Sequence, residues 1–223
     1  MKPPDFVLIE NNFSTAWIDP ITVGEDGIVV GRSGAFGLGT LLVLRCAATD
    51  RVLMGRKSFR QGFEGSNQFA FPGGMLRSDG VFNFDQCVEQ TLVGRVSAET
   101  GISVHSIDRI RPLDTSPPII GRYTINGNRL VSTAILPFYA DIEIELPIMA
   151  NDPTVYAVGW YDPIEVMHEV TQTNALILAQ ALWTRFTPSQ QAKIKPILRP
   201  HFEVVKENAE LLRAREPKPA WEV

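Results

Sequence analysis

The sequence predicts an α/β fold in which a mixed β-sheet of about six to eight strands lies between helices, with an N-terminal extension and C-terminal helices. Three observations lead to this prediction. Two apolar runs, 40–48 and 51–56, flank a tight turn and predict a β-hairpin. A stretch at 69–102 combines a short strand, two glycines and a long helix. A last strand at 155–160 is followed by a strongly apolar helical segment, so strands and helices alternate along the chain.

The composition is typical of a globular protein, and 223 residues are enough for one large domain or a domain with extensions. The net charge of −4 and pI near 5.4 predict no basic surface, so we expect no nucleic-acid partner. No apolar run reaches the length of a membrane span, and the first residues lack a signal-peptide pattern. We therefore expect no membrane partner and a cytoplasmic location. Cys46 and Cys87 are read as buried free thiols, which suits a reducing compartment.

Residues 1–38 are expected to form an N-terminal extension. The apolar run at 6–9 would be a strand, or an arm that packs on the domain or on a second subunit. Residues 21–30 predict a strand interrupted by the turn-forming sequence at 25–27. The four glycines in 31–39 predict a loop, because the segment lacks the Lys-Ser/Thr ending of a phosphate-binding P-loop.

The main domain is expected at 39–170, and it opens with the hairpin named above. Thr49 and Asp50 form the turn between its strands. Residues 57–67 follow as a polar, glycine-containing loop. Its charged side chains either face a ligand or are simply solvated.

The stretch 69–102 is the part of the chain around which the prediction is built. Its apolar strand at 69–71 stops at 72–74, where a proline and two glycines allow a sharp turn and a close approach to a ligand. A polar connection leads to a helix that begins at residue 84 or 85 and ends at Thr100. Gly101 then suits the left-handed conformation that closes a helix. This arrangement can hold a phosphate-bearing ligand against side chains of the helix.

The same stretch resembles the box motif of the Nudix (MutT-like) hydrolase superfamily, G-x5-E-x7-R-E-U-x-E-E-x-G-U, where U is a bulky aliphatic residue. The leading FPGG at 71–74 and the ending Glu-Thr-Gly-Ile at 99–102 match it well. Between them the box is degenerate. Aligned on the ending, Gly94 and Arg95 stand where the family has Arg-Glu, and Ala98 replaces the first of two glutamates.

Two further departures lie upstream in the box. Gln86 falls on the isolated glutamate of the motif. The 19 residues between Gly74 and Gly94 are six more than the family spacing, so the connection carries an insertion. The resemblance therefore predicts the fold more firmly than the chemistry.

The family's chemistry explains why these departures matter. Glutamates at helix positions i, i+3 and i+4 share one face and bind Mg²⁺ ions that bridge a diphosphate and activate water. In this chain the corresponding residues are Arg95, Ala98 and Glu99. A guanidinium cannot bind a metal, and a methyl group offers no ligand atom. Arg95 would instead pair with Glu99 or hold a ligand phosphate directly.

If the protein is catalytically active, the resemblance implies Mg²⁺ or Mn²⁺ as cofactor. Glu99 would be the retained catalytic and metal-binding glutamate, with Asp85 and Glu89 as substitute metal ligands. Glu165, in a short helical turn after the last strand, would supply a further catalytic acid. For Asp85 and Glu89 the alternative is an ordinary surface or helix-capping role.

The resemblance also implies a ligand site beside the glycine turn. We expect Arg60, Gly73, Gly74 and Arg95 to contact the ligand, because the loop that holds Arg60 precedes the FPGG strand and borders the site in the family. The ligand would be a small nucleotide or another diphosphate.

The second half of the domain continues the sheet. Residues 103–110 alternate and predict a strand, and 122–126 predict a short strand that ends in a hairpin turn at 126–128. The returning strand at 130–140 contains Pro137, which suggests a bulge or a sheet edge. Three alternating carboxylates follow, and they form either a cation site or the solvent face of an outer strand: Asp141, Glu143 and Glu145.

Residues 171–223 are expected to form helices that pack on the same domain. The segment 174–186 predicts one apolar helix, and the rest of the chain from 189 predicts one or two amphipathic helices. Before them, Asp162 caps a helical turn that starts at Pro163. We expect part of this helical cover to be available for a homodimer contact.

Two functions remain open at this point. One is a metal-dependent hydrolase of a nucleoside diphosphate linked to another moiety, with activity weakened by the degenerate box. The other is a catalytically silent Nudix-like module that binds a nucleotide-like or diphosphate ligand. The hydrolase requires at least two further carboxylates within reach of a point shared with Glu99, whereas the silent module allows Arg95 to fill that point.

Overall fold

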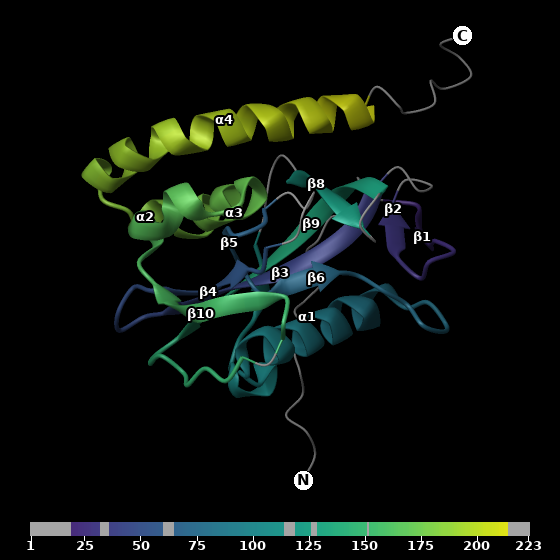
Figure 1. The fold of residues 1–223 in the computed structure, drawn as a ribbon, viewed down its shortest axis with the longest axis horizontal. Coiled ribbons are helices and arrows are strands. Elements are labelled where there is room, and N and C mark those ends of the chain that lie inside the picture. The colour runs from purple at the N-terminus through teal and green to yellow at the C-terminus, as the bar shows by residue number, and fades with distance from the viewer. Residues whose placement is uncertain are drawn as a thin grey trace.

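In the computed structural model we describe residues 19–31, 36–59, 65–113, 119–125, 129–150 and 152–213. A mixed β-sheet lies between helix α1 (Phe84–Thr100) on one face and three helices on the other (Figure 1). These three are α2 (Pro163–Val166), α3 (Gln172–Leu182) and α4 (Pro188–Arg213). The predicted α/β class, with a sheet between helices, is confirmed.

The described residues form ten strands, more than the sequence predicted because several are only two or three residues long. The strands are β1 (Ile21–Val23), β2 (Val29–Gly31), β3 (Phe36–Cys46), β4 (Val52–Lys57), β5 (Phe69–Ala70), β6 (Gly73–Met75), β7 (Arg111–Pro112), β8 (Ile120–Ile125), β9 (Arg129–Ile142) and β10 (Val155–Tyr161). Short 3₁₀ turns occur at η2 (Val104–Ser106), η3 (Met167–Glu169) and η4 (Trp183–Arg185).

Strand β3 is the centre of the sheet. It runs parallel to β9 from Gly37 to Cys46, and on its other edge it pairs in turn with β2, β6 and β4, all antiparallel. Strand β10 extends the sheet beyond β4, while β7 and β8 pair with the far edge of β9. The expected hairpin is present as β3 and β4.

The prediction of a loop at 31–39 is wrong for residues 36–39, which form part of a strand. Strand β3 begins at Phe36, four residues earlier than the sequence suggested. Phe36 and Leu38 are buried, and the backbone between them pairs with both β2 and β9. Two pairing partners thus hold a glycine-rich segment in an extended conformation. Residues 32–35 lie outside the described residues.

The predicted strand at 103–110 is also wrong. The segment forms η2 and an irregular connection. Its buried residues, Val104, Ile107 and Ile110, recur every three positions, and all three enter the core beneath α1. A spacing of three places these side chains on one side of a tight turn, whereas a strand would need a spacing of two.

Pro137 was expected at a bulge or an edge, but it lies inside the interior strand β9. Leu41 of β3 is its partner on one side. On the other side Pro137 falls between the segments of β9 that pair with β8 and with β7. The interruption between these two short strands leaves room in the ladder for a residue without an N–H group.

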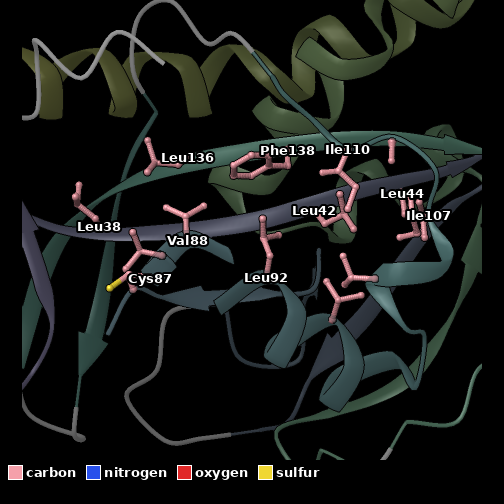
Figure 2. Close-up of a cluster of buried hydrophobic side chains, with 14 of the residues drawn as sticks. Leu38, Leu42, Leu44, Cys87, Val88, Leu92, Ile107, Ile110, Leu136 and Phe138 are labelled. Atoms are coloured by element: carbon pink, nitrogen blue, oxygen red, sulfur yellow. The ribbon is translucent and has the colours of Figure 1, made fainter. Parts of the chain in front are cut away.

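The core is divided by the sheet into two layers. Alternate residues of β3 point to opposite faces, so Leu42 and Leu44 meet α1 while Leu41 and Val43 meet α3. Figure 2 shows the α1 side, where Leu92 lies beneath the sheet. The helix contributes Cys87, Val88, Leu92 and Val96 to this layer.

Helix α1 has the bounds that the sequence predicted. The Asn83 side chain accepts a hydrogen bond from the N–H of Gln86 and caps the first turn. Gly101 follows the last turn with φ of 74°, a conformation in which glycine avoids steric strain.

On the other face, α3 and α4 cover the sheet as expected for the C-terminal helices. Ile177 and Leu178 of α3 and Ile194 of α4 are fully or almost fully buried there. Within the part of the chain that the structure describes, no helix has both the length and the apolar character needed to cross a membrane.

Candidate functional site

The retained box glutamate, Glu99, lies in the last turn of α1 and is almost completely buried, with 3% of its side chain exposed. Lys57, the last residue of β4, donates from Nζ to Glu99 Oε1 over 3.1 Å. Arg95, one helical turn earlier, donates from Nη2 to the same oxygen. Two cations therefore meet at one carboxylate oxygen.

Arg95 connects this carboxylate to two other segments. Its Nη1 lies 2.9 Å from Oδ2 of Asp152, in the segment before β10. Its Nε donates to the carbonyl oxygen of Gly73 over 3.4 Å. The guanidinium is thus held from three sides, although 35% of the Arg95 side chain remains exposed.

We call Lys57, Arg95, Glu99 and Asp152 the ion cluster. It contains two cations and two carboxylates, so its formal charges balance. Removing one partner of such a partly buried group would leave another charge uncompensated, which is costly in a low-dielectric environment.

The surroundings of Asp152 favour the ionised form of its carboxyl. Burial raises its pKa, but hydrogen bonds from Thr154 and the positive charges of Arg95 and Lys57 outweigh that effect. The pKa of Asp152 therefore lies below its usual value. Its Oδ1 accepts the Thr154 N–H at 2.7 Å.

Local structure brings these side chains together. Lys57 lies four residues after Leu53 on β4, so both point to the α1 side of the sheet. The segment that holds Asp152 crosses the end of α1, where the Met149 N–H donates to the Thr100 carbonyl over 2.9 Å. Gly101 permits this crossing, because a Cβ there would lie 2.6 Å from the Met149 carbonyl oxygen.

The predicted metal site of Glu99, Asp85 and Glu89 is not brought together. All three belong to α1, and at 1.5 Å per residue Glu89 lies about 15 Å and Asp85 about 21 Å from Glu99 along the helix axis. One metal ion cannot contact residues so far apart. Among the described residues no group of three or more His, Cys, Asp or Glu side chains could hold a metal ion.

The donors around Glu99 do not fit a divalent cation either. Mg²⁺ needs several oxygen ligands, whereas Glu99 faces an ammonium and a guanidinium. Within the described part of the chain, the residues around Glu99 therefore do not form the magnesium or manganese centre that the resemblance implied.

The predicted catalytic pair of Glu99 and Glu165 is also separated. Glu165 is exposed on α2, and its neighbour Val166 packs in the core beneath α3. Helix α1 covers the opposite face of the sheet (Figure 1). The prediction from sequence placed both acids near one ligand, because the sequence does not reveal which face of the sheet each helix covers.

Glu169, which follows α2, pairs with Arg56 rather than with the ion cluster. Arg56 and Lys57 are consecutive in β4 and so point to opposite faces of the sheet. The Arg56 guanidinium lies over the Phe69 ring, 4.2 Å from its centroid. Two basic residues of one strand thus serve two separate sites.

Gly73 and Gly74 lie in a strand rather than in the turn that was predicted, and their contact with a ligand stays a prediction. They belong to β6 and pair with Leu41 and Thr40 of β3. A Cβ on Gly73 would lie 2.2 Å from the Thr40 carbonyl oxygen, and one on Gly74 would lie 3.2 Å from Arg95 Cγ. Their small size serves close packing against the strand and against Arg95. The fourth predicted ligand residue, Arg60, lies outside the described residues.

Sequence reasoning gave Lys57 only as one of several loop charges that either face a ligand or are solvated, and it missed Asp152 as a member of the site. For Lys57 a signal existed, since its spacing from Leu53 places it on the helix-covered face of β4. For Asp152 there was none, because its contact with Arg95 depends on a long connection returning across the end of α1.

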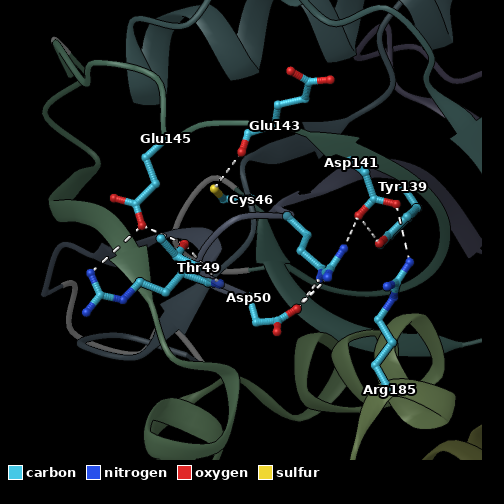
Figure 3. A network of polar contacts seen from close by, with 10 residues as sticks. Cys46, Thr49, Asp50, Tyr139, Asp141, Glu143, Glu145 and Arg185 are labelled. Carbon is cyan, nitrogen blue, oxygen red and sulfur yellow. Dashed lines mark hydrogen bonds and ion pairs between the residues drawn. The ribbon is translucent and has the colours of Figure 1, made fainter.

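The three alternating acids at and just beyond the end of β9 do not form a cation site. Asp141 pairs with Arg45, whose Nη1 lies 2.6 Å from Asp141 Oδ1, and with Arg185, which Figure 3 shows beside it. Glu145 instead accepts a hydrogen bond from Thr49 at 2.8 Å. Strand β9 ends at Ile142, so the alternation does not continue along an extended strand.

Comparisons with known proteins place this geometry in context. No family model matches the sequence, and no curated protein matches it. By contrast, 233 chains of solved structures match the fold.

One match is the dihydroneopterin triphosphate pyrophosphohydrolase of E. coli, with 14% identity, TM-score 0.50, and coverage of 66% of this chain and 95% of that one. Another is the Nudix domain of Shewanella oneidensis NrtR in complex with ADP-ribose, with 16% identity, TM-score 0.48, and coverage of 67% and 88%. A MutT protein of Methanosarcina mazei Go1 matches at 12% identity and TM-score 0.47, with coverage of 67% and 95%. The architecture and the match at TM-score 0.50 show a shared fold, the Nudix-like α/β fold that the sequence predicted.

Proposed function

We propose that this chain is a catalytically silent Nudix-fold module that binds a nucleotide-like, diphosphate-bearing ligand. The observation that carries the proposal is the state of Glu99, whose carboxylate is engaged by Arg95 and Lys57. A metal-dependent hydrolase needs that carboxylate, and others beside it, free to hold the metal.

Arg95 supplies a fixed positive charge where the family has a metal ion. A guanidinium stays protonated at all physiological pH values and forms paired hydrogen bonds with phosphate oxygens. It can therefore neutralise a ligand phosphate without activating water for attack on it. Arg95 has 35% of its side chain exposed and Lys57 has 19%, so both are accessible at the surface of the ion cluster.

The competing function is hydrolysis of a nucleoside diphosphate linked to another moiety. It would need metal ligands other than the set of Glu99, Asp85 and Glu89, which the helix spacing separates. The two functions therefore differ in whether a divalent cation is required.

An activity and binding screen tests the proposal. The full chain would be incubated with ADP-ribose, coenzyme A, NADH and dinucleoside polyphosphates, with Mg²⁺ or Mn²⁺ and separately with EDTA. We expect no turnover in any condition, together with saturable calorimetric binding of at least one compound in EDTA. Turnover that requires the metal would overturn the proposal in favour of the hydrolase.

Variants assign any binding to the ion cluster. Arg95→Gln should lower affinity by about tenfold or more, the effect of losing one charge-assisted contact to a phosphate. The matched control is Arg199→Gln, which removes an exposed arginine on α4, on the opposite face of the sheet. Equal loss in both variants would show that binding is a general charge effect.

A further inference from the structure

The guanidinium of Arg95 already contacts an anion that belongs to the chain itself. Asp152 presents two oxygens to two different donors: Oδ2 to Arg95 Nη1 at 2.9 Å and Oδ1 to the Thr154 N–H at 2.7 Å. The Asp152 side chain is only 8% exposed. A guanidinium and a backbone N–H that converge on one anionic group are also what binds a phosphate oxygen pair.

The charge balance of the ion cluster also indicates that an anion could take the place of Asp152. With Asp152 in place, each cation has a carboxylate partner. Without it, Arg95 and Lys57 would share Glu99 alone, and one positive charge would be uncompensated in a partly buried site. Such a site favours entry of an anion.

Of the two carboxylates, Asp152 is the one that a ligand can replace. Glu99 lies within a helix, contacts two cations and is buried beneath them. Asp152 lies in an irregular segment between β9 and β10. Its side chain can turn away without breaking helix or strand hydrogen bonds.

The donors would remain in place when Asp152 moves. Ser58 holds the backbone that follows Asp152, because its N–H donates to the Thr154 carbonyl at 2.9 Å and its hydroxyl donates to the Pro153 carbonyl at 2.8 Å. Arg95 stays anchored by Glu99 and by the Gly73 carbonyl. The position left by the carboxylate would be a preformed anion site.

We propose that Asp152 is an internal anion that competes with a ligand phosphate for Arg95 and the Thr154 N–H, and so lowers the affinity of the site. This inference rests on the proposed function and specifies which group the ligand must displace. The ligand part recognised here is a phosphate or diphosphate group.

Calorimetric titration with inorganic pyrophosphate in EDTA tests the inference on the full chain. Asp152→Asn keeps an oxygen for the Thr154 N–H but removes the negative charge, and it should bind pyrophosphate about tenfold more tightly than the unmodified chain. Asp152→Ser is a second variant that can still accept from Thr154. Glu203→Gln, at an exposed position of α4, matches the change in net charge and should leave affinity unchanged.

A double variant, Asp152→Asn with Arg95→Gln, should lose the gain, which ties the effect to Arg95 rather than to a loosened fold. Thermal unfolding of each variant identifies the samples that are folded. Pyrophosphate binding that is equal in the unmodified chain and in both Asp152 variants would overturn this inference and leave the proposed function intact. Binding that appears only when Asp152 is replaced would support it. If no variant binds pyrophosphate or any compound of the screen, both proposals fail.

Discussion

Single residues of α1, the helix that carries the box motif, show why it does not present a metal centre. Arg95 and Glu99 form an i, i+4 pair on the face that would otherwise present carboxylates to a metal. Ala98, between them in sequence, is exposed and offers room for a longer side chain.

A double substitution, Arg95→Glu with Ala98→Glu, should therefore create a metal site. Together with Glu99 it would place three carboxylates at i, i+3 and i+4 on one helix face. We expect Mn²⁺ binding, measured by calorimetry or by electron paramagnetic resonance, that the unmodified chain lacks. Ala98→Glu alone is the control, since Arg95 would still occupy Glu99. Equal Mn²⁺ binding by the control would contradict the assigned role of Arg95.

Two glycines provide a second prediction at this scale. A Cβ on Gly94 would meet no heavy atom within 4 Å, so Gly94→Ala should stabilise the protein by about 0.5–1 kcal/mol through helix propensity. Gly73→Ala should instead be strongly destabilising, because its Cβ would lie 2.2 Å from the Thr40 carbonyl oxygen. Urea unfolding of both variants measures the contrast. A destabilised Gly94→Ala variant would indicate a packing role that the structure does not contain.

At the scale of elements, α4 contains a titratable group in its packed face. Burial lowers the pKa of His201 below its ordinary value of 6.5, and its Nδ1 is buried without a hydrogen-bond partner. The unfolded chain therefore binds a proton at His201 more readily than the folded chain does. By linkage, this residue lowers the free energy of unfolding as pH falls below about 6.5.

Replacing His201 should reduce that pH dependence. We expect His201→Gln to lose less stability than the unmodified chain between pH 7.5 and pH 5.5 in urea unfolding. The control is His168→Gln, because His168 is largely exposed, with 64% of its side chain accessible. A His201→Gln profile parallel to that of the unmodified chain would contradict the role assigned to burial.

Elements whose side chains follow a clear local pattern could be predicted from the sequence. The β3–β4 hairpin was found because two apolar runs flank a tight turn, and α1 was found because a long helical stretch stops at Gly101. The segment 103–110 was misassigned because its apolar residues recur every three positions. This spacing lies between the period of two residues for a strand and about 3.6 residues for an α-helix. Strand β6 was predicted as a turn because of its glycines. These glycines allow β3 to pack closely against β6, and that contact cannot be seen in the local sequence.

At the scale of the whole molecule, the sheet separates two groups of charges that are adjacent in sequence. Arg56 pairs with Glu169 on the α2 side, and Lys57 pairs with Glu99 on the α1 side. Sequence reasoning found Glu99 and Arg95, but it could not place Glu165 away from them, because that depends on how the helices are arranged around the sheet. The separation of Asp85 from Glu99 was predictable, since both lie at opposite ends of one predicted helix.

Substitution of these neighbours should separate stability from ligand binding. Lys57→Gln should weaken pyrophosphate binding, because it removes a cation of the ion cluster. Arg56→Gln, the matched substitution one residue earlier, should leave affinity unchanged while weakening contacts to Phe69 and Glu169. Calorimetry and urea unfolding on the same samples give both quantities. Equal loss of affinity in the two variants would mean that the faces are not independent.

The parallel pairing of β3 with β9 has a consequence for how the chain reaches its native state. The Thr40 hydroxyl donates to the Leu136 carbonyl, and ten residue pairs join the two strands from Gly37–Thr133 to Cys46–Ile142. Contacts between segments so distant in sequence require closure of a long loop, and they are associated with slow folding. During synthesis, β3 must therefore leave the ribosome well before its principal partner exists. Until Ile142 has emerged, one edge of this fully buried strand is open to incorrect pairing with other chains.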